Sequence, residues 1–365
     1  MPPDGINDSD LQSHSWFVTG QPLSFTAATH HNGMPILDWR HTRPCIFRRT
    51  ARMWQCVVLA YAWSRREYRA RGLLVRFIRH VRSVLLAAVR PKITWLWFAM
   101  VRRAPLRLGA AQQPYLALKP LLPYINRRWS RIQRMRVIYH SHLLAYSGTT
   151  SSHRALRSPG AVVARFTGHG GLRVDLRLGS DPRFRKEGEW TLTVGEQDTT
   201  RHRLALSFAF DRSPTGQYCC YIGCVQGEVG MNPTIKRLTK AMHGLRPADF
   251  LLHALRRIAA DIGVTELRGV SNKVQVHRRK YLVHLPWHQA LHLNYDRLWI
   301  AFGGIAQADG CFDLPLNVLR RCAAQIPVNK RALYSRRYRM LDEVDLQCRA
   351  APAAHSAQGN SDLFE

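Results

Sequence analysis

The sequence is poor in acidic residues and in lysine. It holds 24 Asp and Glu against 54 Lys and Arg, for a formal net charge of +30, and most of the basic residues are arginines. Acidic residues are scarcest from position 41 to 160, where Glu67 stands alone against 24 Lys and Arg. Such a positive field attracts polyanions, either nucleic acid or the anionic inner face of a membrane. An arginine-rich genome composition would give the same excess of charge, so charge alone selects neither partner.

Long hydrophobic runs and a secretory leader are also missing. The most apolar stretches, CVVLAYAW (56–63) and ITWLWFAMV (93–101), are far shorter than the roughly 20 residues that span a bilayer. The first ten residues, MPPDGINDSD, are polar and acidic, unlike a signal peptide. The eight cysteines are scattered, which is typical of a reducing compartment. We therefore expect a cytoplasmic protein without a transmembrane helix, and contact with the inner membrane surface stays open.

Metal-binding spacing is weak in this chain. Three cysteines and three histidines come nearest to it: Cys219, Cys220 and Cys224, and His284, His288 and His292. On a strand, only two of the thiols share a face, and no second pair follows. The first and third histidines would be about 12 Å apart on a straight helix, and Pro286 interrupts their spacing. We therefore predict no metal site and expect the cysteines to be small buried side chains.

The pattern of residues predicts an α+β protein in four parts. Residues 1–50 are polar and aperiodic and indicate a disordered leader. Met34, within it, and Met53, just after it, are alternative start positions. Residues 51–150 indicate a basic helical region, packed on a mixed β-sheet domain at 151–348. In that domain five alternating segments from 160 to 227 predict an antiparallel sheet, and helices are expected at 233–243, 247–261, 294–304 and 329–348. The tail, 349–365, is low in complexity and is expected to be disordered.

Two basic amphipathic helices are expected in the helical region. In the segment 71–90, one stripe is formed by Leu74, Phe77, Ile78, Val81, Leu85 and Val89, and arginines lie largely off it. The stripe suits an interfacial helix on anionic lipid, or a helix packed in the protein with a solvated basic face. We favour the packed helix, because the stripe is no wider than packing needs. In the segment 126–147, Trp129, Ile132, Met135, Tyr139 and Leu143 form the expected apolar row.

A pair of carboxylates occurs in FRKEGEWTL, at Glu187 and Glu189. Two acids on one strand face suit a general base with a charge partner, and Glu189 is the candidate catalytic residue. The alternative, which we favour, is a hairpin in which Arg183, Arg185 and Lys186 act as counter-ions.

The order of elements after the sheet resembles that of acyl-CoA-dependent N-acyltransferases of the GNAT type. In that fold a strand ends in a loop that holds the donor pyrophosphate, and a later helix carries a tyrosine. The corresponding segment here is QGEVG, with Gln226, Gly227 and Gly230 as candidates for donor binding. Tyr295, in YDRLWIAFGG, is the candidate acid for the leaving thiolate. The loop departs from the Q/R-x-x-G-x-G/A pattern of that fold, so an acyl-CoA-type donor is implied by order rather than by motif.

A second resemblance covers most of the chain, from about residue 70 to 347. The segments that carry it are FRKEGEWTL, YIGCVQG, TKAMHGLRPADFLLHALRRIAADIGV, RGVSN, YDRLWIAFGG and NKRALYSRRYRMLD. In this order they resemble the VirK/YbjX family of bacterial proteins, a domain of unknown function. The resemblance implies a role in envelope integrity, virulence and resistance to cationic antimicrobial peptides, and it implies no catalytic residues.

Three hypotheses about function follow. The first is a VirK/YbjX-type protein at the inner membrane surface; the second is a GNAT-like acyltransferase, which is compatible with the first. A nucleic-acid-binding protein ranks last, because the basic region has no helix-turn-helix, zinc module or stacking aromatic pair. Protein partners are not indicated by the sequence.

Overall fold

The computed structural model describes residues 46–158, 160–197, 199, 203–227, 230–276 and 293–350. From Arg49 onward the chain forms one compact unit. The predicted leader lies outside the described residues except for positions 46–50, which begin the first helix, and the predicted tail lies outside them after 350. The histidine-rich connection at 277–292, with His284, His288 and His292, is also outside them.

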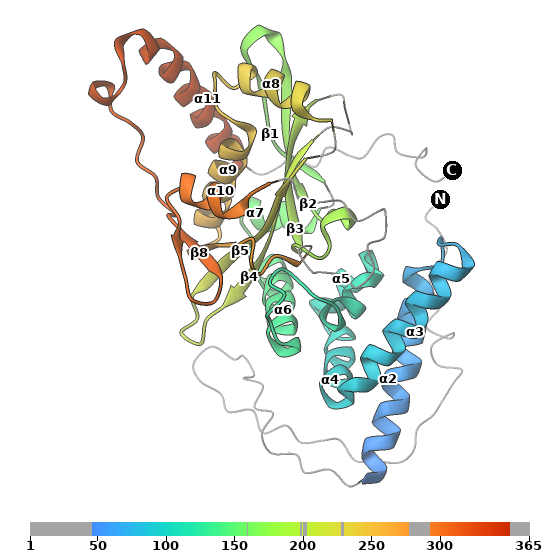
Figure 1. Ribbon diagram of the computed structural model, residues 1–365. Helices are drawn as coiled ribbons and strands as arrows, with labels where there is room; N and C mark the ends of the chain where they lie inside the picture. The colour runs from blue at the N-terminus through green and yellow to red at the C-terminus, as the bar shows by residue number, and fades with distance from the viewer. Residues whose placement is uncertain are drawn as a thin grey trace. The chain divides into compact units, whose positions relative to one another are not determined.

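The described helices and strands are shown in Figure 1. The helices are α2 (Ile46–Glu67), α3 (Leu73–Val89), α4 (Pro91–Val101), α5 (Leu106–Gln112), α6 (Arg131–Ser147), α7 (Ser151–Arg157), α8 (Asn232–Ala241), α9 (Pro247–Asp261), α10 (Tyr295–Ala301) and α11 (Arg331–Arg349). The 3-10 helices are η1 (Pro114–Leu121), η2 (His169–Gly171), η3 (Pro182–Phe184), η5 (Ala323–Gln325) and η6 (Val328–Lys330). The strands are β1 (Ala161–Thr167), β2 (Arg173–Gly179), β3 (Trp190–Glu196), β4 (Leu204–Arg212), β5 (Tyr218–Gln226), β6 (Val264–Val270), β7 (Ile305–Ala306) and β8 (Cys311–Leu314).

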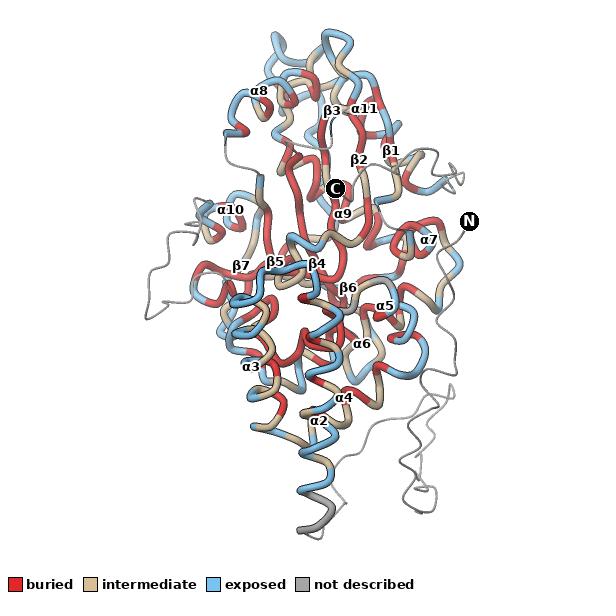
Figure 2. The backbone as a smooth tube through the Cα atoms, turned by 90° about the vertical axis from the view of Figure 1, so that its right-hand side faces the viewer, coloured by how far each residue is buried: buried red, intermediate tan, exposed pale blue. Residues whose placement is uncertain are grey.

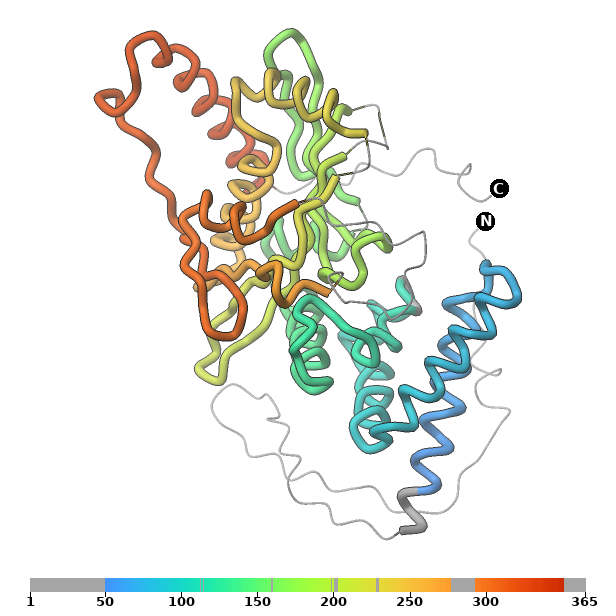
Figure 3. The backbone as a smooth tube through the Cα atoms, in the orientation of Figure 1, coloured from blue at the N-terminus to red at the C-terminus, as the bar shows by residue number. Residues whose placement is uncertain are grey.

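The strands form one mixed sheet in the order β1-β2-β3-β4-β5-β6-β8-β7. The first five are antiparallel, as the alternation of apolar and polar residues predicts. β5 and β6 are parallel, and α8 and α9 form the connection between them, which can be followed in Figure 3. An α+β fold with a mixed sheet is therefore confirmed.

Two apolar clusters hold the sheet between helices. The larger lies between the sheet and the later helices, where α9 packs on β3, β4 and β6, and α11 packs on β1. The smaller lies within the helical region and includes Ala209, Val270 and Cys311 from the sheet. On β4, Phe208 and Phe210 belong to the first cluster and Ala209 to the second, because successive side chains point to opposite faces. β4 is thus buried on both faces, and Figure 2 shows the central strands buried.

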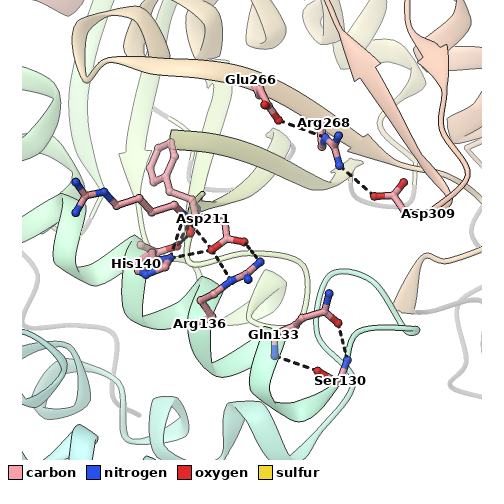
Figure 4. Close-up of polar contacts among 11 residues, drawn as sticks. Ser130, Gln133, Arg136, His140, Asp211, Glu266, Arg268 and Asp309 are labelled. Atoms are coloured by element: carbon pink, nitrogen blue, oxygen red, sulfur yellow. Dashed lines mark hydrogen bonds and ion pairs between the residues drawn. The ribbon is translucent and has the colours of Figure 1, made fainter. Parts of the chain in front are cut away.

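α6 packs on β4 beyond the point where β3 begins. β3 begins at Trp190 opposite Phe208, and beyond that point Ser141 of α6 accepts from the Phe210 N–H and donates to the Phe210 carbonyl. Arg136 and His140 of α6 bind the Asp211 carboxylate, and a capping box between Ser130 and Gln133 starts the helix (Figure 4).

The apolar row expected for the second basic helix is partly wrong. In α6, Ile132 is exposed and Leu143 is half-buried, whereas Met135, Ile138, His142 and Ala145 are buried. The buried row is rotated because Ser141 and His142 bind the sheet region through their polar atoms, so polar residues occupy the inner face.

α3 is also oriented differently from the packed helix that we favoured. Its buried residues are Ser83 and Ala87, and the large apolar side chains of the predicted stripe face solvent. α4 follows at Pro91, as expected of a proline that ends one helix and begins the next. Among the described residues no single helix is long and apolar enough to cross a membrane; α3 and α4 reach that length and composition only together, with a bend of 110°.

Candidate functional site

The end of β5 departs from regular pairing on both sides. β5 pairs with β6 from Tyr218 as far as Ile222, opposite Gly269, but continues to Gln226 with β4 alone. On the β4 side, Ser207 pairs with Cys224 and Phe208 with Ile222, so Gly223 is an extra residue in a β-bulge. A bulge bends its strand and ends regular pairing. Pairing of the parallel strands ends at Ile222, the residue before the bulge.

Gly223 is required at the bulge by close packing. A Cβ atom there would lie 1.9 Å from the Glu187 carbonyl oxygen, a distance that no side chain could accept. Gly188 is equally close to β4, because its Cβ would lie 2.4 Å from Ser207 Oγ. The turn at 187–188 thus lies flat against β4 and β5 where β6 diverges.

The Tyr295 side chain binds the β5 backbone beyond the last residue that pairs with β6. Its hydroxyl accepts a hydrogen bond from the Val225 N–H and donates one to the Val225 carbonyl, each at 3.3 Å. The residue is fully buried at the first position of α10. A side-chain hydroxyl therefore substitutes here for the backbone of a neighbouring strand.

Asn272, just after β6, fixes the position of Tyr295. Its side-chain oxygen accepts from the Tyr295 N–H at 3.1 Å, and its amide nitrogen donates to Asn294 Oδ1 at 2.6 Å. Asp296 in turn accepts from the Asn272 N–H at 2.8 Å. The start of α10 is thereby joined to the end of β6 on both sides of the tyrosine.

The surroundings of the Tyr295 hydroxyl favour its protonated form. Burial, then Cys224 and Glu187, raise the pKa of Tyr295 well above its ordinary value, and the Gln226 side chain acts weakly in the opposite direction. Burial and Glu187 likewise raise the pKa of the Cys224 thiol. Tyr295 therefore stays protonated, as the predicted acid must, but its raised pKa makes it a weaker acid than an ordinary tyrosine. Cys224 lacks the thiolate that a nucleophile requires.

The predicted donor-binding residues follow directly on β5. Gln226 ends the strand, and Gly227 and Gly230 lie in the loop before α8, although residues 228–229 fall outside the described part. Gly230 has a φ of +83°, in the region that favours glycine, and the space around it is open. The structure brings Gln226 and Tyr295 together at Val225; the roles in donor binding and catalysis stay predictions.

Glu189 belongs to a different, fully buried cluster. Its carboxylate binds Lys119 Nζ at 2.7 Å, the Tyr124 hydroxyl at 2.7 Å and His142 Nε2 at 3.1 Å. Burial alone would raise its pKa, but Lys119 and His142 hold the pKa of Glu189 below its ordinary value. A carboxylate held ionised by three partners is suited to joining the helical region to the sheet, so its catalytic role stays a prediction that these contacts do not favour.

The partners of Glu189 differ from the basic residues that the sequence predicts as its counter-ions. Arg183 binds Asp181 and Arg185 binds Glu67, and Lys119 is the partner that sequence reasoning missed. Lys119 lies 70 residues before Glu189, so local spacing gives no signal of the pairing. Glu187, rather than Glu189, is the acid close enough to raise the pKa of Tyr295.

A third polar group lies at the other end of the sheet. There Arg268 of β6 binds Glu266, Asp309 and Asp313, beside the Asp211 cluster (Figure 4). These groups are partly exposed and mutually paired, which is typical of a structural network. Within the described ranges no group of three or more His, Cys, Asp or Glu residues is placed to hold a metal ion.

Comparison with known proteins identifies the family. A family model described as "Protein of unknown function (DUF535)" matches residues 74–350. The chain belongs to this family.

Similar proteins include "Uncharacterized protein YbjX" of Escherichia coli K12, 28% identical over 290 residues, or 78% of this chain and 83% of that protein. An uncharacterized protein of Haemophilus influenzae is 28% identical over 230 residues, or 62% of this chain and 74% of that protein. "Membrane protein LapB" of Mannheimia haemolytica is 30% identical over 92 residues, or 24% of this chain and 38% of that protein. No solved structure matches the chain.

Four of the segments that carry the family resemblance meet around the candidate site. Gly223 in YIGCVQG faces Glu187 in FRKEGEWTL. A Cβ on Gly269, in RGVSN, would lie 2.5 Å from the Trp299 ring, whose N–H donates to the Val270 carbonyl at 2.7 Å. Trp299 belongs to YDRLWIAFGG, as does Tyr295. The segments are thus in contact because they build the parting of β5 and β6.

Proposed function

We propose that this DUF535 protein is an acyltransferase that uses an acyl-CoA-type thioester donor and acts on a component of the cell envelope. The observation that carries the proposal is the end of β5–β6 pairing next to the Gly223 bulge, with the Tyr295 hydroxyl on the buried β5 backbone that β6 leaves unpaired. Bulges of this kind often lie next to active sites, where they end pairing and redirect a strand.

The order of elements supports this assignment. β5, its glycine loop, α8 and α9, β6, α10 and the β7–β8 hairpin follow the order expected of the GNAT type. In that type the donor lies between the parted parallel strands and its phosphates meet the following loop. Here that loop is Gln226–Gly230, and the N–H groups before α8 suit a phosphate. For a donor chain to reach β5, the Tyr295 hydroxyl must leave the Val225 carbonyl.

The residues at the site account for each proton in an acyl transfer. An amine or hydroxyl acceptor attacks the thioester carbon, and the carbon–sulfur bond breaks. Glu187, buried next to the bulge, takes the proton that the acceptor loses. Tyr295, whose raised pKa keeps it protonated, gives a proton to the leaving thiolate. The products are the acylated acceptor and the free thiol of the donor.

The envelope component is proposed from the family resemblance. The VirK/YbjX resemblance implies envelope integrity, virulence and resistance to cationic antimicrobial peptides, and the relative from Mannheimia haemolytica is named as a membrane protein. Acylation of an envelope lipid would give such phenotypes a chemical basis, because it changes how the envelope packs and what charge it presents.

Calorimetry with purified protein tests the proposal. We expect micromolar binding of acetyl-CoA, or of palmitoyl-CoA below its micelle concentration, that is lost in the Gly227→Asp, Gly230→Asp variant. The control is Gly170→Asp, Gly263→Asp. It matches the change at Gly230, since these three glycines have positive φ and open surroundings, and neither control glycine lies in the site. Absence of binding to either donor, or equal loss in both folded variants, would remove the donor-loop assignment.

A further inference from the structure

The face of α3 that points away from the protein is apolar. We define the α3 stripe as Leu73, Leu74, Phe77, Ile78, Leu85 and Val89, which are 56% to 75% exposed. The residues of α3 that are buried against the rest of the chain are Ser83 and Ala87. A helix of a water-soluble surface normally has the reverse arrangement, with its large apolar side chains inside. The α3 stripe therefore needs a partner that the described chain does not supply.

The helix α3 is held in place by the small and polar residues of its opposite face. His80 of α3 binds Ser64 Oγ of α2 at 2.8 Å and lies edge-on to the Tyr61 ring. Arg131 of α6 donates to the Leu86 carbonyl at 3.0 Å, and the Arg79 guanidinium lies over the Tyr68 ring. α2 and α3 lie side by side in Figures 1 and 3. These contacts fix the rotation of α3, so the stripe faces outward as a consequence of packing.

Charge around the stripe is of one sign. Positions 46–90 hold eleven arginines and one acidic residue, Glu67, and Glu67 is bound to Arg185. At 3.6 residues per turn, Arg82 lies at one edge of the stripe, whereas Arg79 lies on the packed side of α3, over the Tyr68 ring. Arg90 follows at its C-terminal end. An apolar strip bordered by cations complements a surface that has anionic groups outside and hydrocarbon beneath.

Aromatic side chains of α2 fit the same kind of surface. Trp54 and Tyr61 are 64% and 47% exposed, and amphipathic rings are enriched where lipid headgroups meet hydrocarbon. The α3 helix has 17 residues, about 25 Å in length, which suits a helix lying in the plane of the interface.

We propose that the α3 stripe docks in the plane of an anionic phospholipid membrane, with its apolar side chains among the acyl chains and the arginines at the phosphates. The proposal is argued independently of the acyl-transfer site, since the stripe belongs to α3 and the site to β5 and α10. If both hold, docking would bring the sheet site to acceptors that reside in a lipid surface.

Vesicle sedimentation with the full chain tests the docking. We expect binding to vesicles of phosphatidylcholine with about a quarter phosphatidylglycerol and little binding to phosphatidylcholine alone. Binding should decline as salt rises from about 0.05 to about 0.5 M, because salt screens the attraction between arginines and phosphates. The test variant is Phe77→Glu, Ile78→Glu, whose positions are exposed, so the fold is not at stake. We expect its partition coefficient to fall about tenfold or more.

The matched control is Val328→Glu, Leu346→Glu. These positions are also exposed and apolar, at 76% and 67%, and the control adds the same negative charge away from α3. We expect it to bind within about threefold of the unchanged protein. Equal losses in both variants would show a general charge effect and overturn the docking of the stripe. A stable dimer that Phe77→Glu, Ile78→Glu dissociates, with no vesicle binding, would overturn it in favour of a second copy of this chain.

Discussion

Lys119 and Glu189 form an ion pair with almost no access to water. Their side chains are 2% and 1% exposed, and the pair joins η1 to the residue before β3. Removing one member of such a pair leaves an unpaired buried charge, which costs about 3–5 kcal/mol. The cost arises from loss of solvation, because the remaining carboxylate has no water to replace the ammonium group.

We therefore predict that Lys119→Met lowers the free energy of unfolding by about 3–5 kcal/mol in urea denaturation. The double variant Lys119→Met, Glu189→Gln should recover part of this loss, because no net charge is left in the cluster. A loss below about 1 kcal/mol in the single variant would contradict a structural role for the pair.

Asp211 gives the stability of α6 on β4 a dependence on pH. Burial would raise its pKa, but hydrogen bonds and charges from His140 and Arg136 hold the pKa below its ordinary value. A depressed folded pKa means that the contribution is complete above the unfolded pKa, near 4, and is lost as pH falls through the lower folded pKa.

The matching prediction compares the protein with Asp211→Asn. At pH 7 the variant should be less stable by roughly 1–3 kcal/mol, since it loses charge-assisted hydrogen bonds. In denaturant melts the difference should shrink as pH falls below about 4. The ordinary pKa of about 4 lies between about pH 7 and about pH 3. A stability difference that stays constant over this range would contradict the lowered pKa of Asp211.

At the scale of elements, the bulge in β5 depends on Gly223. A methyl group there would meet the Glu187 carbonyl at 1.9 Å, so the 187–188 turn or the strand must move. We predict that Gly223→Ala costs about 1–3 kcal/mol of stability, as overpacked cores do, and that it also weakens donor binding. The control is Gly72→Ala, with nothing within 4 Å and a φ of −55°, for which a change below about 1 kcal/mol is expected.

Most elements were predictable from local pattern, whereas their surroundings were not. Alternation predicts β1–β5, and proline at the first turn together with Gly244 places α8 and α9. The two-residue strand β7 was missed because it is too short to show a period. The sequence predicts the apolar stripe of α3. Amphipathicity alone does not tell whether the apolar side faces protein or solvent.

The candidate site was only half predictable for the same reason. Gln226 and Tyr295 could be proposed from the order of elements, since a loop after β5 and a helix after β6 must lie close together. The Gly223 bulge, the approach of Glu187 and the pairing of Lys119 with Glu189 result from tertiary packing between segments far apart in sequence. No local spacing in the sequence predicts these contacts.

At the scale of the whole molecule, the account assigns acyl transfer to one end of a mixed sheet and membrane docking to a helix outside it. The first assignment is central, and hydrogen exchange tests it most directly, because the Val225 N–H is bonded to a hydroxyl that a donor would displace. We would measure amide exchange of residues 222–227 with and without saturating acetyl-CoA. The account predicts slower exchange there in the complex, with little change in β8; unchanged exchange at the end of β5 in a complex that calorimetry shows to be formed would contradict it.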